Sequence, residues 1–318
     1  MPVAAALTLF ALSLAATLAA AAFFARRLDR LGVHLGLPEA LVGLLTALAA
    51  DAPELSSALI ALGTGEREVG VGVVVGSNLF NLAAMIGLSA LLAGAVTLSR
   101  EALLLEGGVG LLVTVVAGAL ILGWIGAAIA LVLMAALLIP YLLALLVGPE
   151  RLAHGGHHIL ENVHVGEEAA LRLVGSLLTA VVFVVLGSAG MVKAAVALSD
   201  EWNVPRAFVG TLILAGLTSL PNSFTAVRLG LARRGGALVS ETFNSNTINL
   251  VGGLAVPALF VSLGAATGIV RMELLWLVAM TLFCLAMLGR PRGAGRAAGA
   301  VIIAGYFVFV AVFVATGG

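Results

Sequence analysis

The sequence is poor in charged residues, which make up only 10% of its 318 positions. A soluble domain carries about 25% charged residues, so this chain cannot cover a surface that faces water. Hydrophobic residues make up 62% of it, the mean hydropathy is +1.19, and apolar runs near 20 residues recur. Lipid offers the backbone no hydrogen-bond partners, and continuous rather than alternating runs favour helices over a barrel. We expect an all-α polytopic protein embedded in a lipid bilayer.

Cysteine and net charge are also scarce. The single Cys284 excludes a disulfide framework. Sixteen basic residues balance sixteen acidic ones, which gives no reason to expect a nucleic-acid partner. The opening MPVAAALTLF lacks the basic segment of a secretory signal, and its apolar run ends at Arg26 and Arg27. This pattern predicts a first transmembrane helix.

The apolar runs predict ten transmembrane helices. The longest polar interval, 148–170, follows the fifth run and divides the chain into two five-helix halves, 1–147 and 171–318. Because each half has an odd number of spans, homologous halves would have opposite topology, as in the inverted repeats of secondary transporters. The ten predicted spans are 3–24, 36–62, 69–96, 102–123, 125–147, 171–197, 206–230, 237–264, 272–289 and 297–316.

Lysine and arginine predict the orientation, because loops on the cytoplasmic side are enriched in them. With the N-terminus outside, 12 basic residues fall on the inner side and 4 on the outer side. We therefore expect both termini outside and the central loop in the cytoplasm. Abundant Ala, Gly, Leu, Val and Arg is typical of a GC-rich prokaryote, which predicts the cytoplasmic membrane. The 4 outer residues are Arg67, Lys193, Arg206 and Arg271.

The two halves match at an offset of 168 residues. ALAADAPELSSALIAL from Ala47 aligns with AGLTSLPNSFTAVRLG from Ala215, which places Pro53 on Pro221. A proline removes a backbone donor and clashes with the carbonyl four residues earlier, so both helices should break there. Freed carbonyls and half-helix ends could then face an ion. The first of these motifs lies in 44–90 and its counterpart in 212–258.

A second motif pair has the same offset, since GSNLFN at 76–81 falls on NSNTIN at 244–249. Helical spacing of three or four residues places the polar side chains of each helix on one face. Four such faces would enclose a site near the bilayer midplane. Its oxygen ligands suit hard cations such as Ca²⁺, Na⁺ and Mg²⁺, and the lack of Cys and His argues against zinc or copper. The residues that share faces are Asp51 with Glu54, Ser77 with Asn81, and Glu241 with Ser245 and Asn249.

At these motifs the sequence resembles the cation/calcium antiporter superfamily, which includes the sodium/calcium exchangers. The family pattern is G-T-S-x-P-E followed by G-S-N-x-x-N or G-S-N-x-x-D, and the counterparts here are 49–54 with 76–81 and 217–222 with 244–249. The resemblance implies alternating access, with the first and sixth spans sliding past the rest. It also implies ion ligands at Glu54, Ser77, Asn81, Thr218, Ser219, Asn222, Ser245 and Asn249.

The sequence departs from this family pattern in its acidic residues. Asn222 stands where a second acidic residue is usual, and Asn249 where a third is frequent. Asp51 adds a carboxylate where the pattern has serine, so the acidic charge is concentrated in the first half. Glu241, one turn before Ser245, adds a charge to the second half. We expect Glu54 to be the central cation ligand and Asp51 a charge or proton partner.

The predicted function is secondary active antiport of Ca²⁺ against Na⁺, without a cofactor and without enzymatic activity. The alternative is a cation/H⁺ or Na⁺/H⁺ exchanger, since the close carboxylates of Asp51 and Glu54 exchange their protons in coupled steps. A channel would need rings of subunits or a filter, and neither is evident. An enzyme would need a nucleophile–base pair or a hydrophilic catalytic loop, and neither is recognisable.

Structural roles are open for the same residues. Asp51 could cap the half-helix after the break, the asparagines could join helices, and the serines could bond their own helix. Glu241 could be solvated near the cytoplasmic end. The loop histidines His154, His157, His158 and His164 could sense metal or pH, although a solvated loop is the simpler interpretation.

Overall fold

Helices form almost the whole of the computed structural model, which describes residues 1–34, 39–147 and 167–317. Central loop residues 148–166, with all four loop histidines, lie outside the described residues. The first half consists of α1 (Val3–His34), α2 (Glu39–Ala50), α3 (Ala52–Gly63), α4 (Arg67–Asn81), α5 (Ser89–Ala93), α6 (Arg100–Ala102), α7 (Gly108–Ile121) and α8 (Ala127–Val147). The second half consists of α10 (Glu167–Trp202), α11 (Arg206–Phe208), α12 (Ala215–Thr218), α13 (Leu220–Leu231), α14 (Gly235–Leu250), α15 (Gly268–Leu288) and α16 (Arg296–Ala315).

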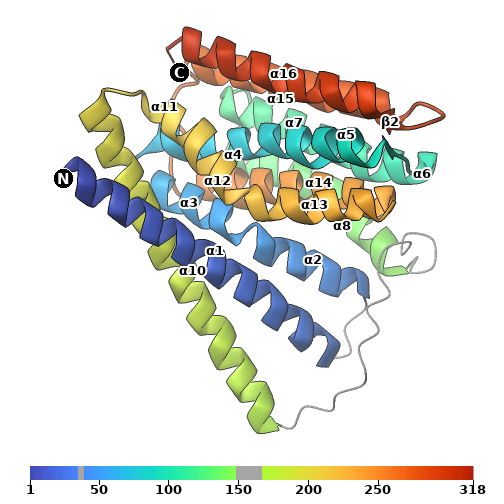
Figure 1. Cartoon of the computed structure of the whole chain (residues 1–318), viewed down its shortest axis with the longest axis horizontal. Coiled ribbons are helices and arrows are strands. Elements are labelled where there is room, and N and C mark those ends of the chain that lie inside the picture. Colours follow the sequence, from blue (N-terminus) through green and yellow to red (C-terminus); the bar gives the residue numbers. More distant parts are fainter. Residues whose placement is uncertain (35–38, 148–166, 318) are drawn as a thin grey trace.

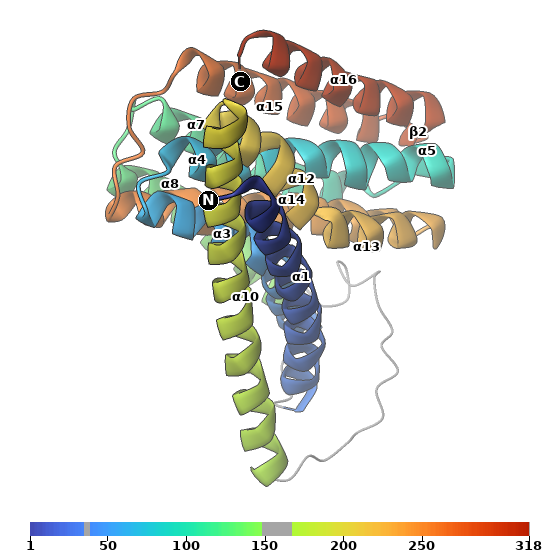
Figure 2. The ribbon, with the colours of Figure 1, turned by 60° about the vertical axis from the view of Figure 1, so that its left-hand side comes forward.

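The long helices α1 and α10 lie side by side and extend away from the remaining helices (Figures 1 and 2). Small residues allow this close approach, as is common between membrane helices. A Cβ atom added to Gly187 would lie 2.1 Å from Thr17 Oγ1, and one added to Gly190 would lie 2.1 Å from Ser13 Oγ. Both helices are longer than the predicted spans 3–24 and 171–197, because no proline interrupts their charged ends.

Both predicted helix breaks are present. Asp51 separates α2 from α3, and Ser219 separates α12 from α13, with Pro53 and Pro221 in the first turn of the helix that follows. At Ser219 the axis bends by 48°. The two breaks have nearly the same backbone, with φ −80° and ψ −3° at Asp51 and φ −82° and ψ −2° at Ser219.

Helix α4 lies in the interior and packs against α3, α12, α14 and α15 (Figure 1). Valine, glycine and asparagine fill it, and nearly all of its residues from Val69 onward are buried. Five described segments have π- or 3₁₀-helical hydrogen bonding, which the sequence did not predict: Leu82–Leu88 (η1), Leu103–Gly107 (η2), Val209–Leu214 (η3), Val251–Ala255 (η4) and Pro257–Leu259 (η5).

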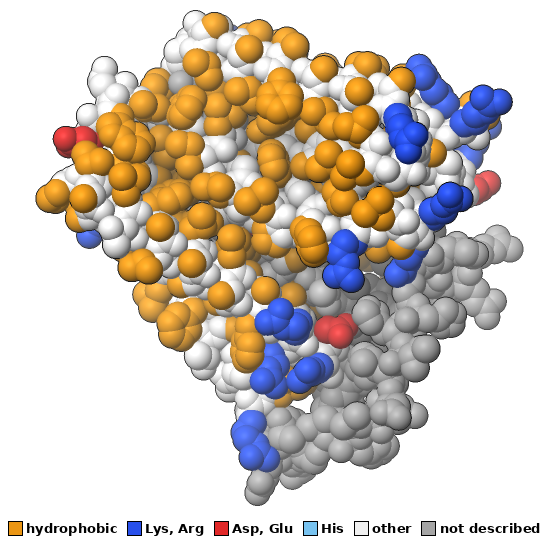
Figure 3. Space-filling model, in the orientation of Figure 1, with side chains coloured by type: hydrophobic (Ala, Val, Ile, Leu, Met, Phe, Trp, Pro, Cys, Tyr) orange, Lys and Arg blue, Asp and Glu red, His pale blue; other side chains and the backbone are white. Residues whose placement is uncertain are grey.

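A short antiparallel pair of strands, β1 (Ala95–Val96) and β2 (Ala294–Gly295), joins the two halves of the chain at one end of the molecule. Side chains of Lys and Arg gather at this end, which lies to the right in Figure 3, while hydrophobic side chains cover the middle. Both termini lie at the opposite end, to the left in Figure 1. We call these the basic end and the terminal end.

The apolar surface identifies a multi-pass membrane protein. Among the described residues, 7 helices are long and apolar enough to cross a membrane, or 8 if the bent pair Arg206–Thr218 and Leu220–Leu231 is one span. The broken helix α2–α3 and the polar helix α14 are outside this set. The count of ten spans therefore stays a prediction.

Candidate ion-binding site

The two helix breaks place two carboxylates at the centre of the fold. Asp51 occupies the break itself and Glu54 the first turn of α3, and each is only 1% exposed. Asp51 makes no capping hydrogen bond to α3, so its side chain does not have the capping role that its position suggests. Peptide N–H groups in the first turn of a helix favour the negative charge of Glu54.

Each carboxylate accepts a hydrogen bond from the opposite broken helix. Asn222 Nδ2 donates to Asp51 Oδ1 over 2.7 Å, and Ser219 Oγ donates to Glu54 Oε1 over 2.9 Å. Position 51 is equivalent to 219 and position 54 to 222 under the 168-residue offset. The contact between 51 and 222 is therefore equivalent to the contact between 219 and 54. The sequence offset is thus reproduced as a pair of equivalent contacts.

A second set of contacts joins α4 to α14 through asparagines. Asn78 Nδ2 donates to the carbonyl of Asn246 over 3.1 Å, and Asn246 Nδ2 donates to the carbonyl of Asn78 over 3.2 Å. Asn81 Nδ2 donates to Asn246 Oδ1 over 3.0 Å, and Asn249 Nδ2 to Asn78 Oδ1 over 3.3 Å. These bonds are equivalent under the same offset. The amide N–H groups therefore join helices, in agreement with the structural interpretation of these residues.

Ser245 connects the two sets of contacts. Its Oγ donates to Asp51 Oδ1 over 2.6 Å and accepts from Asn81 Nδ2 over 3.2 Å. Asn222 Nδ2 is 3.5 Å from the same hydroxyl. Helices α4, α13 and α14 and the first break thus meet in one polar network.

Four buried oxygens at this network accept no hydrogen bond from any described residue: Asp51 Oδ2, Glu54 Oε2, Asn81 Oδ1 and Asn249 Oδ1. The described residues also give Asp51 and Glu54 no ion pair. Buried carboxylates are costly unless paired or bound to a metal. Carboxylate and amide oxygens are the ligands that hard cations prefer. The arrangement can therefore bind a cation between the broken helices.

Among the described contacts, three predicted site residues make no hydrogen bond to this network. Ser77 Oγ donates to the carbonyl of Val73 over 2.6 Å, and Thr218 Oγ1 to that of Leu214 over 2.8 Å, so both hydroxyl protons are used within their own helices. Glu241 is partly buried, interacts electrostatically with Asp51, and its Oε2 has no partner among the described residues.

The sequence did not single out Asn78 and Asn246 as site residues, although both are in the quoted motifs. Their contacts fix the crossing of α4 and α14, on which Asn81, Ser245 and Asn249 lie. The offset repeat itself was the signal, because these two asparagines align with each other.

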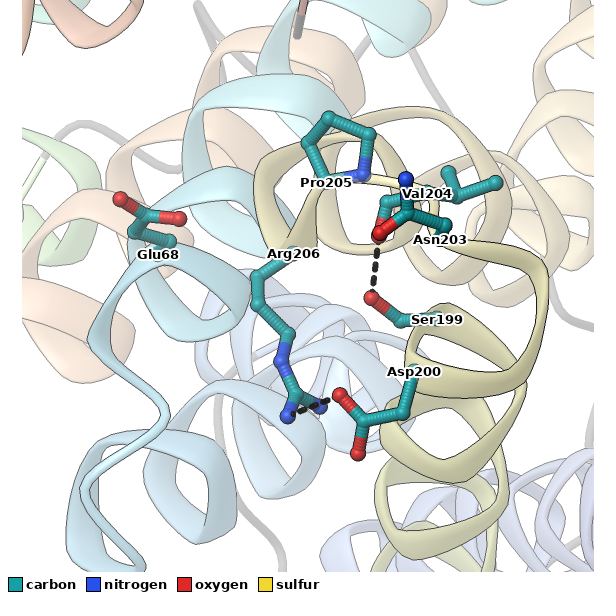
Figure 4. Close-up of a pocket in the computed structure, with 7 residues that line it drawn as sticks. All are labelled: Glu68, Ser199, Asp200, Asn203, Val204, Pro205 and Arg206. Atoms are coloured by element: carbon teal, nitrogen blue, oxygen red, sulfur yellow. Dashed lines mark hydrogen bonds and ion pairs between the residues drawn. The ribbon is translucent and has the colours of Figure 1, made fainter.

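A separate depression of about 500 Å³ lies at the terminal end, between the end of α10 and the start of α4 (Figure 4). Arg206 Nη2 is 2.8 Å from Asp200 Oδ1, and Arg206 Nη1 donates to the carbonyl of Val196 over 3.0 Å. Because Arg206 is paired here and Asp51 and Glu54 do not line this depression, it is a surface feature and not the cation site.

Two broken membrane helices that cross two polar helices around buried carboxylates define a membrane ion transporter. The family model described as "Sodium/calcium exchanger protein" matches residues 5–147 and 172–315, and the chain belongs to this family. It is accordingly a multi-pass membrane protein for cation antiport and not an enzyme. The cations are its substrates, and no cofactor is needed.

Solved structures show the same fold. The sodium-calcium exchanger NCX_Mj soaked with 10 mM Na⁺ and zero Ca²⁺ is 21% identical with a TM-score of 0.65, and 97% of this chain and 99% of that chain are covered. Native YfkE is 19% identical with a TM-score of 0.67, covering 96% and 91%. Comparison with curated proteins gives no match.

Proposed function

We propose that the protein exchanges Ca²⁺ for Na⁺ across the cell membrane through a site between the two broken helices. The observation that carries this proposal is the set of buried oxygens without hydrogen-bond partners at Asp51, Glu54, Asn81 and Asn249. They lie where both broken helices and both asparagine-rich helices meet, and no described basic residue neutralises the carboxylates. A cation would supply that positive charge.

The proposed ligands come from both halves of the chain. Glu54 is the central ligand, and Asp51 supplies the second charge. Oxygens of Ser219, Asn222, Ser245, Asn81 and Asn249 complete the site, Ser77 and Thr218 contribute lone pairs, and Glu241 adds charge on the side toward the start of α14. Two carboxylates would neutralise one Ca²⁺, while Na⁺ would require fewer charges.

The distribution of basic residues supports the proposed orientation. We assign the basic end to the cytoplasm because Lys and Arg gather there, and the terminal end to the outside (Figures 1 and 3). The chain would then cross the membrane ten times in two five-helix halves of opposite topology, 1–147 and 171–318, joined by the central loop 148–170. Contacts that are equivalent under exchange of the two halves support the repeat itself, and the odd number of spans in each half would make its topology inverted.

Helices α1 and α10 are the proposed moving part. They pack chiefly on each other and otherwise against α2, α3, α12 and η3, the elements that form and adjoin the helix breaks. A slide of this pair across the broken helices would open the site alternately to the two sides, as the family resemblance implies.

A cation/H⁺ exchanger, or an Na⁺/H⁺ exchanger, is the second candidate function. Asp51 and Glu54 interact electrostatically. Two carboxylates this close exchange protons in coupled steps, so a proton could replace Na⁺ as the counter-ion.

A flux panel in proteoliposomes tests these proposals. The uptake of Ca²⁺, Mg²⁺, Mn²⁺ and Na⁺ is measured in turn, once with an outward Na⁺ gradient and once with a proton gradient. Ca²⁺ uptake that requires the Na⁺ gradient supports the first proposal, and uptake that requires only the proton gradient supports the second. Flux independent of every counter-ion would contradict both.

A further inference from the structure

One of the buried carboxylates outside the central site, Glu106, belongs to a closed ring of four side chains. Glu106 of η2 is 6% exposed, and Tyr141 of α8 is 4% exposed. Tyr141 Oη lies 2.9 Å from Glu106 Oε2 and 2.8 Å from Asn244 Oδ1. Ser240 Oγ lies 3.0 Å from Glu106 Oε1 and 3.2 Å from Asn244 Nδ2. Each side chain therefore contacts the next, and the ring closes on Glu106.

The number of protons available decides the state of this ring. The tyrosine and serine hydroxyls each supply one proton. Asn244 also supplies one, because its amide nitrogen lies at one of its two ring contacts and its oxygen at the other. An ionised Glu106 therefore leaves three protons for four contacts. This count is the same if the amide of Asn244 is turned over, because nitrogen and oxygen merely change places.

A protonated Glu106 supplies the missing proton. Its O–H donates to Tyr141 Oη, Tyr141 donates to Asn244 Oδ1, Asn244 Nδ2 donates to Ser240, and Ser240 donates to Glu106 Oε1. All four contacts then contain one proton each. An ionised carboxylate in the same place would be a buried charge with one unprotonated O···O contact, which is unfavourable in a low-dielectric environment.

Within the described part of the chain, the surroundings of the ring offer no compensating positive charge. Among the described residues, Glu106 has no ion pair. The helices around η2 bring other titratable groups toward it. These are Tyr141 on α8, Glu241 next to Ser240 on α14, and Cys284 on α15. On the adjoining α6, Arg100 and Glu101 are exposed and make no ion pair with Glu106.

We propose that Glu106 is a proton-binding site, separate from the central carboxylates, and that its proton closes the ring with Tyr141, Asn244 and Ser240. Ser240 and Asn244 lie on α14, which also carries Ser245, a hydrogen-bond donor to Asp51. The closed ring fixes α14 to η2 and α8. Release of the proton opens one contact and frees this end of α14, so protonation of Glu106 controls the helix that supplies part of the central site.

Infrared difference spectroscopy of the purified protein tests the proton directly. Glu106→Gln removes the acid but keeps the ring, because the Gln amide donates to Tyr141 and accepts from Ser240. We expect the carbonyl stretch of one protonated carboxylic acid to be present at neutral pH in the wild type and absent in the variant. Tyr141→Phe keeps the acid but removes its acceptor, so the band should move to higher frequency. Glu273→Gln is the matched control, since Glu273 is buried but bonded to Thr211 outside the ring, and the Glu106 band should remain.

The pH profile of cation exchange tests the control of α14, and this arm rests on the proposed function. Glu106→Gln should keep at alkaline pH the rate that the wild type has at acidic pH. An unchanged acid band in Glu106→Gln would overturn the proton site. A pH profile of Glu106→Gln that equals that of the wild type would overturn the coupling to α14. Because the infrared result does not depend on transport, failure of the proton site and failure of the proposed antiport are distinguishable.

Discussion

At the scale of single residues, the distribution of acidic charge distinguishes this exchanger from the family pattern. Asp51 stands in the first break where the pattern has serine, and Asn222 stands where it has a second acid. The structure places these two residues against each other, with 2.7 Å between Asn222 Nδ2 and Asp51 Oδ1. Compared with the family pattern, the carboxylate is on the other partner of this hydrogen bond, in the first broken helix instead of the second. Both broken helices still contribute to the same network.

Replacing Glu54 tests the central ligand. Two unit charges 4 Å apart attract each other by about 4 kcal/mol at an effective dielectric constant of 20. Losing even about 1.4 kcal/mol of this in Glu54→Gln would weaken cation binding about tenfold. We expect at least that loss, measured as the concentration for half-maximal Ca²⁺ flux. The control Glu101→Gln changes an exposed carboxylate on α6 and should leave flux unchanged. Wild-type flux in Glu54→Gln would exclude it as a ligand.

A charge exchange between Asp51 and Asn222 tests their pairing. Asn222→Asp alone sets two carboxylates against each other and removes the amide donor, so Ca²⁺ flux should fall. The double variant Asp51→Asn, Asn222→Asp restores one carboxylate and one amide, and should recover part of the flux. Residues in contact usually have coupling energies of about 0.5–3 kcal/mol. A double variant no better than the product of its single variants would show that the contact is unimportant for transport.

The motif residues show what sequence reasoning can and cannot predict. Repeated prolines and asparagines at a constant offset predicted that four polar helix faces meet, because the repeat places them at equivalent depths. The ring of Glu106, Tyr141, Asn244 and Ser240 was not predicted, because Tyr141 and Glu106 are in different helices and outside the repeated motifs. Glu106 was not singled out either, although it is an acid in an apolar run and intramembrane acids are functional candidates by default.

At the scale of helices, close packing around α4 holds the broken helices in place. A Cβ atom added to Gly76 would lie 2.3 Å from the carbonyl oxygen of Thr211, and one added to Gly210 would lie 2.5 Å from that of Val69. Backbone atoms cannot move away as a flexible side chain can. The second broken helix therefore depends on small residues in α4 and η3 for its position.

Gly76→Ala tests this packing. We expect a loss of about 1–3 kcal/mol in the free energy of unfolding, as for other overpacked sites, together with reduced Ca²⁺ flux. The matched control is Gly175→Ala in α10, where an added Cβ atom meets nothing within 4 Å. That control should be neutral or gain up to about 1 kcal/mol. Equal thermal unfolding of the two variants in detergent would contradict the packing argument.

The positions of the helix breaks were predicted from the sequence, whereas the π-helical segments and the short strand pair were not. The breaks were expected four residues before Pro53 and Pro221, near Ala49 and Leu217. Helix α2 ends at Ala50 and α12 at Thr218, because proline acts locally on the backbone. The π-helical segments depend on packing between helices far apart in sequence. The pairing of β1 with β2 does as well, since it joins Ala95 to Gly295, so neither has a local signal.

At the scale of the whole molecule, the basic end and the terminal end predict a single orientation in the membrane. The single cysteine, Cys284, is buried in α15, which gives a low background for labelling introduced cysteines. Thr316→Cys near the C-terminus should react with a membrane-impermeant maleimide in intact cells. Arg233→Cys, in the turn between α13 and α14, should react only after permeabilisation. The reverse pattern would show that the protein is inserted the other way.

In the proposed antiport, one cation moves against another through the site at Asp51 and Glu54. Its most direct test is Ca²⁺ accumulation in proteoliposomes loaded with Na⁺ and diluted into Na⁺-free medium, with the membrane potential clamped at zero. We expect Ca²⁺ inside to rise above the outside concentration and to fall back when the Na⁺ gradient is dissipated. Accumulation that stops at equal Ca²⁺ concentrations, with or without the gradient, would contradict it.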